Sequence, residues 1–276
     1  MESYRINNLD SINHIVYCRL KINSITDPLK RLNCRHLITD PPLSFDLPAL
    51  GRSLRIDSRP AFMKRLEKLA GEAMALARPQ GVARLFPLAV VDGEHTKIGD
   101  VIFTSALMVR NMGQLARAFP YLATEGPELA AWSEALGSVF DRMLASALRE
   151  KTVLQYRDAL EARVLEQYGI RQLSDMSPGS LALWPIEQQA ELFELMAPVP
   201  DELHLTLSSA FLMKPEYSVS GIFFETEQKY YNCRLCPQAN CRNHYVFCKP
   251  GHSAGHYHQP IAGLPCNNGF FSNRPH

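Results

Sequence analysis

The sequence predicts an α+β fold, in which helices pack against one mixed or antiparallel sheet. Strand-like runs lie before and after a long middle stretch with helical spacing, and this separation is typical of α+β domains. The chain has 276 residues, of which 46% are hydrophobic and 21% are charged, so it can bury a substantial core. One large domain with less regular ends is therefore expected.

The first clear element is a helix that begins at Pro60. Its apolar residues recur at helical spacing as far as the stop at Pro79, and proline suits a first helical position. Residues 1–42, in contrast, show no sustained period and end in two prolines. We expect them to form a poorly structured N-terminal extension.

Strands and a short helix are expected next. Residues 82–91 form a compact apolar run closed by Asp92 and Gly93, and residues 98–104 form a second run. This pattern predicts a pair of strands joined by a polar turn. Residues 105–112 then predict a short helix that Gly113 ends.

The rest of the regular pattern is mainly helical. A strand is expected up to Tyr121, and residues 128–167 carry apolar residues at helical spacing, with Gly137 either dividing that helix or lying inside it. Pro185 opens a further helix. Residues 203–207 alternate apolar with polar residues, which predicts a strand, and residues 219–224 are a second strand candidate.

Charge and hydropathy exclude some classes of partner. The net charge of +1 creates no overall field that would attract nucleic acid or an acidic membrane. No stretch approaches the roughly 20 apolar residues that cross a bilayer, and the N-terminus lacks the pattern of a secretory signal. We therefore expect a cytoplasmic protein that binds neither nucleic acid nor membrane.

A cluster of cysteines is the sharpest local signal. Cys233 and Cys236 are separated by two residues, Cys241 follows, and either His244 or Cys248 could supply a fourth ligand. Thiolates at this spacing can share one metal ion across a tight turn, as in closed tetrahedral zinc sites.

Other readings of the cysteine cluster stay open. Iron–sulfur clusters also use cysteine pairs at this separation. The cysteines could also be reduced and bind no metal, or form a regulatory disulfide. Residues 249–276, rich in Gly, Ser, Pro and His, are expected to form a flexible tail.

Several segments, taken in order, resemble the stand-alone proteins related to the activation domain of vitamin B12-dependent methionine synthase. The matching segments are residues 72–79, 98–105, 123–129, 177–179, 184–189, 192–193, 213–215 and 218–222, followed by the cysteine cluster. The resemblance covers about residues 43–248, which we take as one domain that includes the Cys-rich segment 233–248.

The resemblance implies a curved sheet that binds S-adenosylmethionine. In that family the compound donates the methyl group that repairs oxidised cobalamin, and the cobalamin is carried by a partner. A corrinoid protein or cobalamin-dependent methyltransferase would be that partner, and a separate electron-donor protein would supply the electron. An iron–sulfur cluster at the cysteines would fit such an electron path, whereas zinc would have a structural role.

The family's donor-binding signature, Arg-x-x-x-Gly-Tyr, is altered in this chain. Laid on residues 175–180, it keeps Gly179 but has Asp175 in place of Arg and Ser180 in place of Tyr. An acid cannot make the forked contacts that Arg makes with a carboxylate. Ser177, Gly179 and Ser180 are the predicted cofactor-binding residues, with Arg171 as a candidate replacement for the missing cation.

Two kinds of function follow from these observations. The first is reactivation of a corrinoid protein by S-adenosylmethionine-dependent reductive methylation, as an enzyme or as a component of such a system. The second is a non-catalytic, metal-binding partner of a corrinoid methyltransferase, in which the altered signature marks a lost donor site. Without the resemblance, residues 177–179 would be interpreted as a simple turn, because Pro-Gly favours turns.

Overall fold

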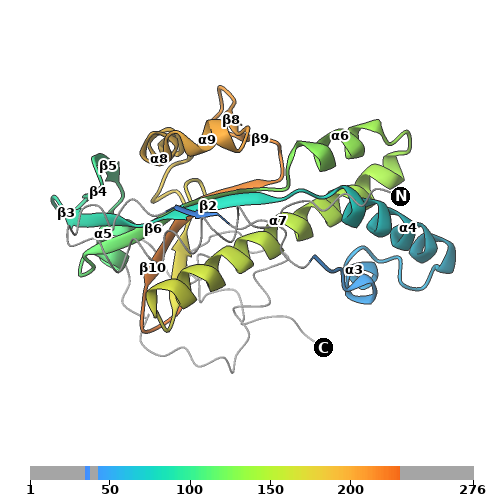
Figure 1. Cartoon of the computed structure of the whole chain (residues 1–276), viewed down its shortest axis with the longest axis horizontal. Coiled ribbons are helices and arrows are strands. Elements are labelled where there is room, and N and C mark those ends of the chain that lie inside the picture. Colours follow the sequence, from blue (N-terminus) through green and yellow to red (C-terminus); the bar gives the residue numbers. More distant parts are fainter. Residues whose placement is uncertain (1–34, 38–42, 231–276) are drawn as a thin grey trace, which may run out of the picture.

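The structure is a computed structural model, and it describes residues 35–37 and 43–230 of the chain. One antiparallel sheet of eight strands runs through this part, with helices on both of its faces (Figure 1). This architecture confirms the predicted α+β class. Every strand pair is antiparallel, so the mixed alternative is not the one adopted by the described strands.

The elements are bounded as follows. The helices are α3 (Leu47–Ser53), α4 (Pro60–Leu76), α5 (Ala106–Met112), α6 (Pro127–Ala135), α7 (Val139–Tyr168), the 3-10 turn η1 (Ile186–Gln188), α8 (Gln189–Met196) and α9 (Val199–Glu202). The strands of the large sheet are β1 (Arg35–Leu37), β2 (Gln80–Arg84), β3 (Phe86–Val90), β4 (His95–Ile98), β5 (Val101–Thr104), β6 (Arg117–Thr124), β7 (Leu173–Met176) and β10 (Ser218–Glu225). A small separate hairpin joins β8 (Thr206–Leu207) to β9 (Met213–Lys214).

Strand β6 is the centre of the large sheet. On one side it pairs with β10, and β10 in turn pairs with β7. On the other side it pairs first with β2 and then with β3, which follow one another along the chain with a break at Leu85. Strands β4 and β5 extend the sheet beyond β3, and β1 lies against β2.

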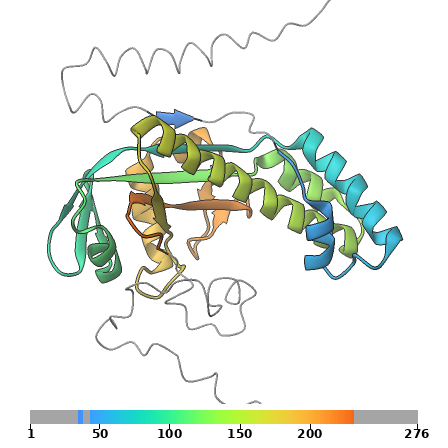
Figure 2. The same cartoon turned by 90° about the horizontal axis from the view of Figure 1, so that it is seen from below.

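The two faces of the sheet bury different side chains. Alternate residues of a strand point to opposite faces, so Phe119 and Tyr121 of β6 face one way while Leu122 faces the other. Phe119 and Tyr121 pack with Leu160 and Val164 of α7, which crosses that face diagonally (Figure 2). Leu122 packs on the opposite face, with residues of α5, α8 and α9.

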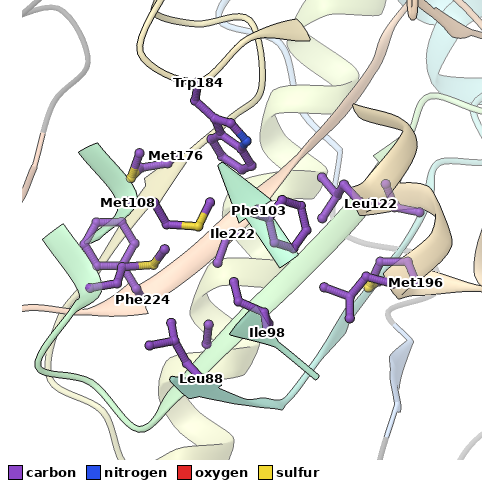
Figure 3. Packing of buried hydrophobic residues seen from close by; sticks show 14 of the residues in the cluster. Leu88, Ile98, Phe103, Met108, Leu122, Met176, Trp184, Met196, Ile222 and Phe224 are labelled. Carbon is purple, nitrogen blue, oxygen red and sulfur yellow. The ribbon is translucent and has the colours of Figure 1, made fainter. Parts of the chain in front are cut away.

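The core on the α8 face is built around Trp184. Its indole packs edge-on against Phe103, with ring centroids 6.1 Å apart, and Met108 and Met176 lie beside it (Figure 3). Trp184 is only 1% exposed, and full burial of such an aromatic side chain contributes strongly to stability. The segment that precedes α8 is therefore anchored to the sheet.

A third cluster lies at the far end of the sheet, between α3, α4, α6 and the first half of α7. Leu66 and Leu69 of α4 meet Leu144 and Leu148 of α7 in this cluster. A bidentate ion pair between Arg65 and Asp141 closes its rim, with nitrogen–oxygen distances of 2.8 and 2.7 Å. The long helix α7 therefore contributes both to this cluster and to the cluster with Phe119 and Tyr121 on its face of the sheet.

Several expected elements are confirmed. Helix α4 begins at Pro60, as predicted, and its apolar stripe is buried. The Ser105 hydroxyl accepts a hydrogen bond from the Met108 amide and so caps α5, which ends at Gly113. Gly137 lies between α6 and α7, so it divides the long helical stretch rather than lying inside one helix.

Other expectations were wrong in detail. Residues 82–91 form two strands rather than one, because the strand is interrupted at Leu85. Before the break β2 pairs with β6, and after it β3 pairs with both β6 and β4. Residues 203–207 form only the short β8, and His204 has a φ of 55° in a turn before it. Strand β7 was not expected at all.

Some predictions concern parts of the chain outside the described residues. They are the N-terminal extension, of which residues 1–34 and 38–42 lie outside, and the whole of segment 231–276, which holds the Cys-rich region and the tail. Among the helices of the described part of the chain, none is both long and apolar enough to span a bilayer.

Candidate functional site

The predicted cofactor-binding residues lie in a tight turn that follows β7. The Gly179 amide donates a hydrogen bond to the Trp184 carbonyl at 2.8 Å, and the Ser180 amide donates to the Ser177 carbonyl at 3.2 Å. Leu181 and Trp184 form an isolated bridge at the neck of the loop. Ser177, Gly179 and Ser180 are thus brought together by the backbone.

Gly179 has a conformation that this turn requires. Its φ is +77°, in the left-handed region where glycine carries no Cβ penalty. A Cβ at this position would also lie 2.7 Å from Cδ1 of Ile186. Both the backbone conformation and the close approach of η1 therefore favour glycine here.

Arg171 does not join this turn. It is exposed and precedes β7, whereas the turn follows β7. The intervening residues form a strand, not a helix, and a strand rises about 3.3 Å per residue. Arg171 therefore lies at the opposite end of β7 from Gly179.

A different arginine contacts the altered signature position. Arg157 of α7 forms an ion pair with Asp175, with 2.9 Å between the guanidinium nitrogen and the carboxylate oxygen. The Tyr121 hydroxyl donates a hydrogen bond to the other Asp175 oxygen at 3.3 Å. The Asp175 side chain is 26% exposed and that of Arg157 is 18% exposed, so the pair lies at the rim of the α7 face.

Aromatic rings support this ion pair from the sheet. Tyr121 of β6 stacks on Phe223 of β10, with ring centroids 4.0 Å apart and planes 13° apart. The Arg157 guanidinium lies over the Phe223 ring at 5.5 Å, within the range of cation–π attraction. The position of Arg157 is thus set by both the carboxylate and the ring beneath it.

The Tyr121 hydroxyl and the Ser177 hydroxyl meet at Gly221. A Cβ built on Gly221 would lie 2.9 Å from the first oxygen and 2.8 Å from the second. Glycine at this point of β10 leaves room for both groups, which places Ser177 beside the Asp175 cluster. Burial raises the pKa of Tyr121 well above its ordinary value, and the charge of Asp175 raises it further, so the hydroxyl keeps its proton.

More charges complete the cluster around Asp175. Arg157 also contacts Asp158 at 2.7 Å and Glu161 at 3.4 Å, and Lys229 reaches Glu161 at 3.0 Å. We call these five side chains the Asp175 cluster: Asp158, Glu161 and Asp175 with Arg157 and Lys229. Three carboxylates and two cations leave it with one net negative charge.

Glutamines that follow the turn tie it to the sheet. The side chain of Gln188 bonds to both backbone groups of Thr104 on the edge strand β5. Its carbonyl oxygen accepts from the Thr104 amide at 2.9 Å, and its amide nitrogen donates to the Thr104 carbonyl. Gln189 is buried and donates to the Ser220 hydroxyl of β10 at 2.7 Å. Gln188 and Gln189 belong to segment 184–189, one of those that carry the family resemblance. In this fold they have a structural role, because they attach the turn to the sheet.

Sequence reasoning missed Arg157 and Tyr121. Tyr121 and Asp175 are 54 residues apart, and Arg157 lies in the middle of a long helix with many other charges. No local motif marks either residue. Only the pairing of β6, β7 and β10 under α7 brings them to Asp175.

No group of three or more potential metal ligands is present among residues 35–37 and 43–230. The predicted ligands Cys233, Cys236, Cys241, His244 and Cys248 all lie outside that part of the chain.

No protein-family model and no curated protein matches the sequence. Among solved structures, a similar one is the crystal structure of the MetH reactivation domain bound to AdoHcy. The TM-score is 0.56 and the sequence identity is 18%, and the match covers 72% of this chain and 80% of that chain.

At this identity the similarity defines the fold. The chain has a methionine synthase activation domain-like fold, in which helices cover an antiparallel sheet on both faces. This finding confirms the fold that the resembling segments predicted.

Proposed function

We propose that this protein binds S-adenosylmethionine, or a closely related nucleoside, at the turn that follows β7. In this role it would serve the reductive methylation that reactivates a corrinoid protein in the cytoplasm. The observation that carries the proposal is the fold, because the similar MetH reactivation domain is bound to AdoHcy. Fold alone does not imply function, so the proposal also depends on the turn itself.

The turn offers groups suited to a nucleoside ligand. Gly179 and Ser180 are exposed, and Ser177 lies between them and the Asp175 cluster. Exposed backbone at a glycine lets a ligand approach closely, and hydroxyl groups can donate to or accept from ribose and amino-acid groups. S-adenosylmethionine would supply the methyl group, and these residues would bind and orient it.

The partner would supply the rest of the chemistry. Cobalamin would be carried by a corrinoid protein or a cobalamin-dependent methyltransferase, and a separate protein would deliver the electron. An exposed turn at the edge of a sheet is compatible with a large planar partner, because no described element covers Gly179 and Ser180. Arg171, at the other end of β7, remains only a predicted contact.

Calorimetric titration of the full chain with S-adenosylmethionine and with AdoHcy tests the proposal. We expect saturable binding that a Gly179→Ala variant weakens by at least about tenfold, because alanine is strained at positive φ and would press on Ile186. Gly137→Ala is the matched control, since a Cβ there would meet no atom within 4 Å. Absence of heat with both ligands at high concentration would contradict the proposal.

A second candidate is a non-catalytic, metal-binding partner of a corrinoid methyltransferase. The ion pairs of Arg157 favour this second function. Arg157 already bonds to Asp158 and Asp175, so it offers no free cation to the carboxylate of a methyl donor. In this case Cys233, Cys236 and Cys241, with His244 or Cys248, would hold zinc or an iron–sulfur cluster in the C-terminal region.

Metal analysis of anaerobically purified full-length protein tests this candidate. We expect stoichiometric zinc, or iron with sulfide and a brown colour, that Cys236→Ser greatly reduces and Cys18→Ser leaves unchanged. Protein that carries neither metal above trace amounts would exclude this second function.

A further inference from the structure

The turn that follows β7 lies beside a net negative charge. The Asp175 cluster holds three carboxylates and two cations, and both cations are already paired with acids. Ser177 connects the turn to this cluster, because its hydroxyl and that of Tyr121 meet at Gly221 while Tyr121 donates to Asp175.

The negative charge is not sealed off from solvent. The Asp175 side chain is 26% exposed and that of Asp158 is 65% exposed, whereas Arg157 is 18% exposed. Asp175 and Asp158 are thus more open to an approaching ligand than Arg157, whereas Glu161 is 12% exposed and its partner Lys229 is 37% exposed. A charged ligand at the turn would feel an attractive or repulsive field according to its sign.

We infer that Asp175 makes this site rank its ligands by positive charge, so that a sulfonium donor binds more tightly than its neutral thioether product. The inference rests on the proposed function and names the chemical class that the site prefers. S-adenosylmethionine and AdoHcy carry the same amino-acid zwitterion and differ by the methyl group on sulfur and the positive charge that it brings. The site would therefore release the demethylated product more readily than it releases the donor.

Three ligands provide a graded test. AdoHcy has no net charge, S-adenosylmethionine has one positive charge, and decarboxylated S-adenosylmethionine has two. For charges near a protein surface, each added unit should strengthen binding about three- to tenfold at low salt. The gradient should shrink as salt is added, because exposed charges are screened.

The experiment is a calorimetric titration of the full-length protein with each ligand at low and high salt. In Asp175→Asn the cluster has no net charge and the side chain keeps its shape, so we expect the affinities for the three ligands to converge. Glu161→Gln makes the same change in charge without altering Asp175 and should flatten the gradient in the same way. Glu166→Gln, near the end of α7 with a side chain 64% exposed, is the matched control and should keep it.

Each outcome has a distinct meaning. Equal binding of the three ligands by the unaltered protein, or an unchanged gradient in Asp175→Asn, would overturn the inference and leave the proposed function standing. Failure of all three ligands to bind the unaltered protein would overturn the proposed function itself. Circular dichroism of each variant checks that it is folded before its affinities are compared.

Discussion

At the scale of single residues, a buried ion pair joins the end of β6 to α7. Arg149 donates to Glu125 through Nε at 3.0 and 2.8 Å, and the side chains are 7% and 0% exposed. The guanidinium also lies over the Tyr217 ring at 4.5 Å. Burial raises the pKa of Glu125 even though Arg149 opposes that shift, so the carboxylate depends on its partner.

Removal of the arginine alone should be costly. We expect Arg149→Met to lower the free energy of unfolding by about 3–5 kcal/mol, because it leaves a buried carboxylate without its cation. The double variant with Glu125→Gln should recover part of the loss. Urea unfolding measures both, and Arg163→Met, which breaks only the outer pair with Glu166, should change stability by less than about 1 kcal/mol.

A second ion pair should make stability depend on acid pH. The hydrogen bond from Arg65 lowers the pKa of Asp141 below its ordinary value of 3.8. A lowered pKa in the folded state contributes stability that is present above the ordinary value and is lost as the pH falls through the folded value. We therefore expect Asp141→Asn to flatten the acid side of the plot of stability against pH.

Thermal melting between about pH 6 and pH 2 measures this effect. Arg65→Gln should flatten the curve in the same way, since it removes the cation that does most to lower the pKa of Asp141. A curve that keeps its full acid slope in both variants would show that other carboxylates dominate.

At the scale of elements, the contact of β10 with β7 depends on glycine. A Cβ on Gly221 would lie 2.4 Å from the Met176 carbonyl and close to two hydroxyls. Backbone cannot move aside as a flexible side chain can, so the strands would have to separate. The close approach is what brings the Asp175 cluster and Ser177 together.

A pair of glycine substitutions tests this contact. We expect Gly221→Ala to destabilise the protein by about 1–3 kcal/mol through overpacking. Gly71→Ala, in the exposed interior of α4 with no atom within 4 Å of the new Cβ, should instead stabilise it by about 0.5–1 kcal/mol. Denaturant unfolding of the two variants measures both, and loss of stability in Gly71→Ala would contradict the account.

Elements with a strong local pattern were predictable, and β7 was not. Pro60 and the apolar stripe define α4, and Ser105 and Gly113 bracket α5. Strand β7 has only four residues, Leu-Ser-Asp-Met, and Asp is a poor strand former. It is a strand because β10 pairs with it, which is tertiary context and not propensity.

At the scale of the whole molecule, α7 and the sheet join the three apolar clusters. Leu144 and Leu148 of α7 pack in the cluster with α4, and Leu160 and Val164 pack on the sheet. The strands then carry side chains into the cluster around Trp184 on the other face. We therefore expect the described part of the chain to unfold as one cooperative unit.

The two tryptophans report on different ends of this unit. Trp132 packs in the cluster with α4, and Trp184 is buried in the cluster under α8. We expect Trp132→Phe and Trp184→Phe each to show a fluorescence midpoint equal to its own circular dichroism midpoint during thermal unfolding. Separate midpoints within one variant would show that the clusters melt independently.

The sequence by itself determined the α+β class, most of the helices and the turn at residues 177–179. Each depends on local spacing or on the conformational preferences of Pro and Gly, which neighbouring residues express without the rest of the chain. Only the tertiary structure decided which side chains contact Asp175, the residue at the altered Arg position of the signature. Arg157 and Tyr121 reach Asp175 across long separations in the chain, and Arg171 does not, because strand pairing and the path of α7 determine which charges meet.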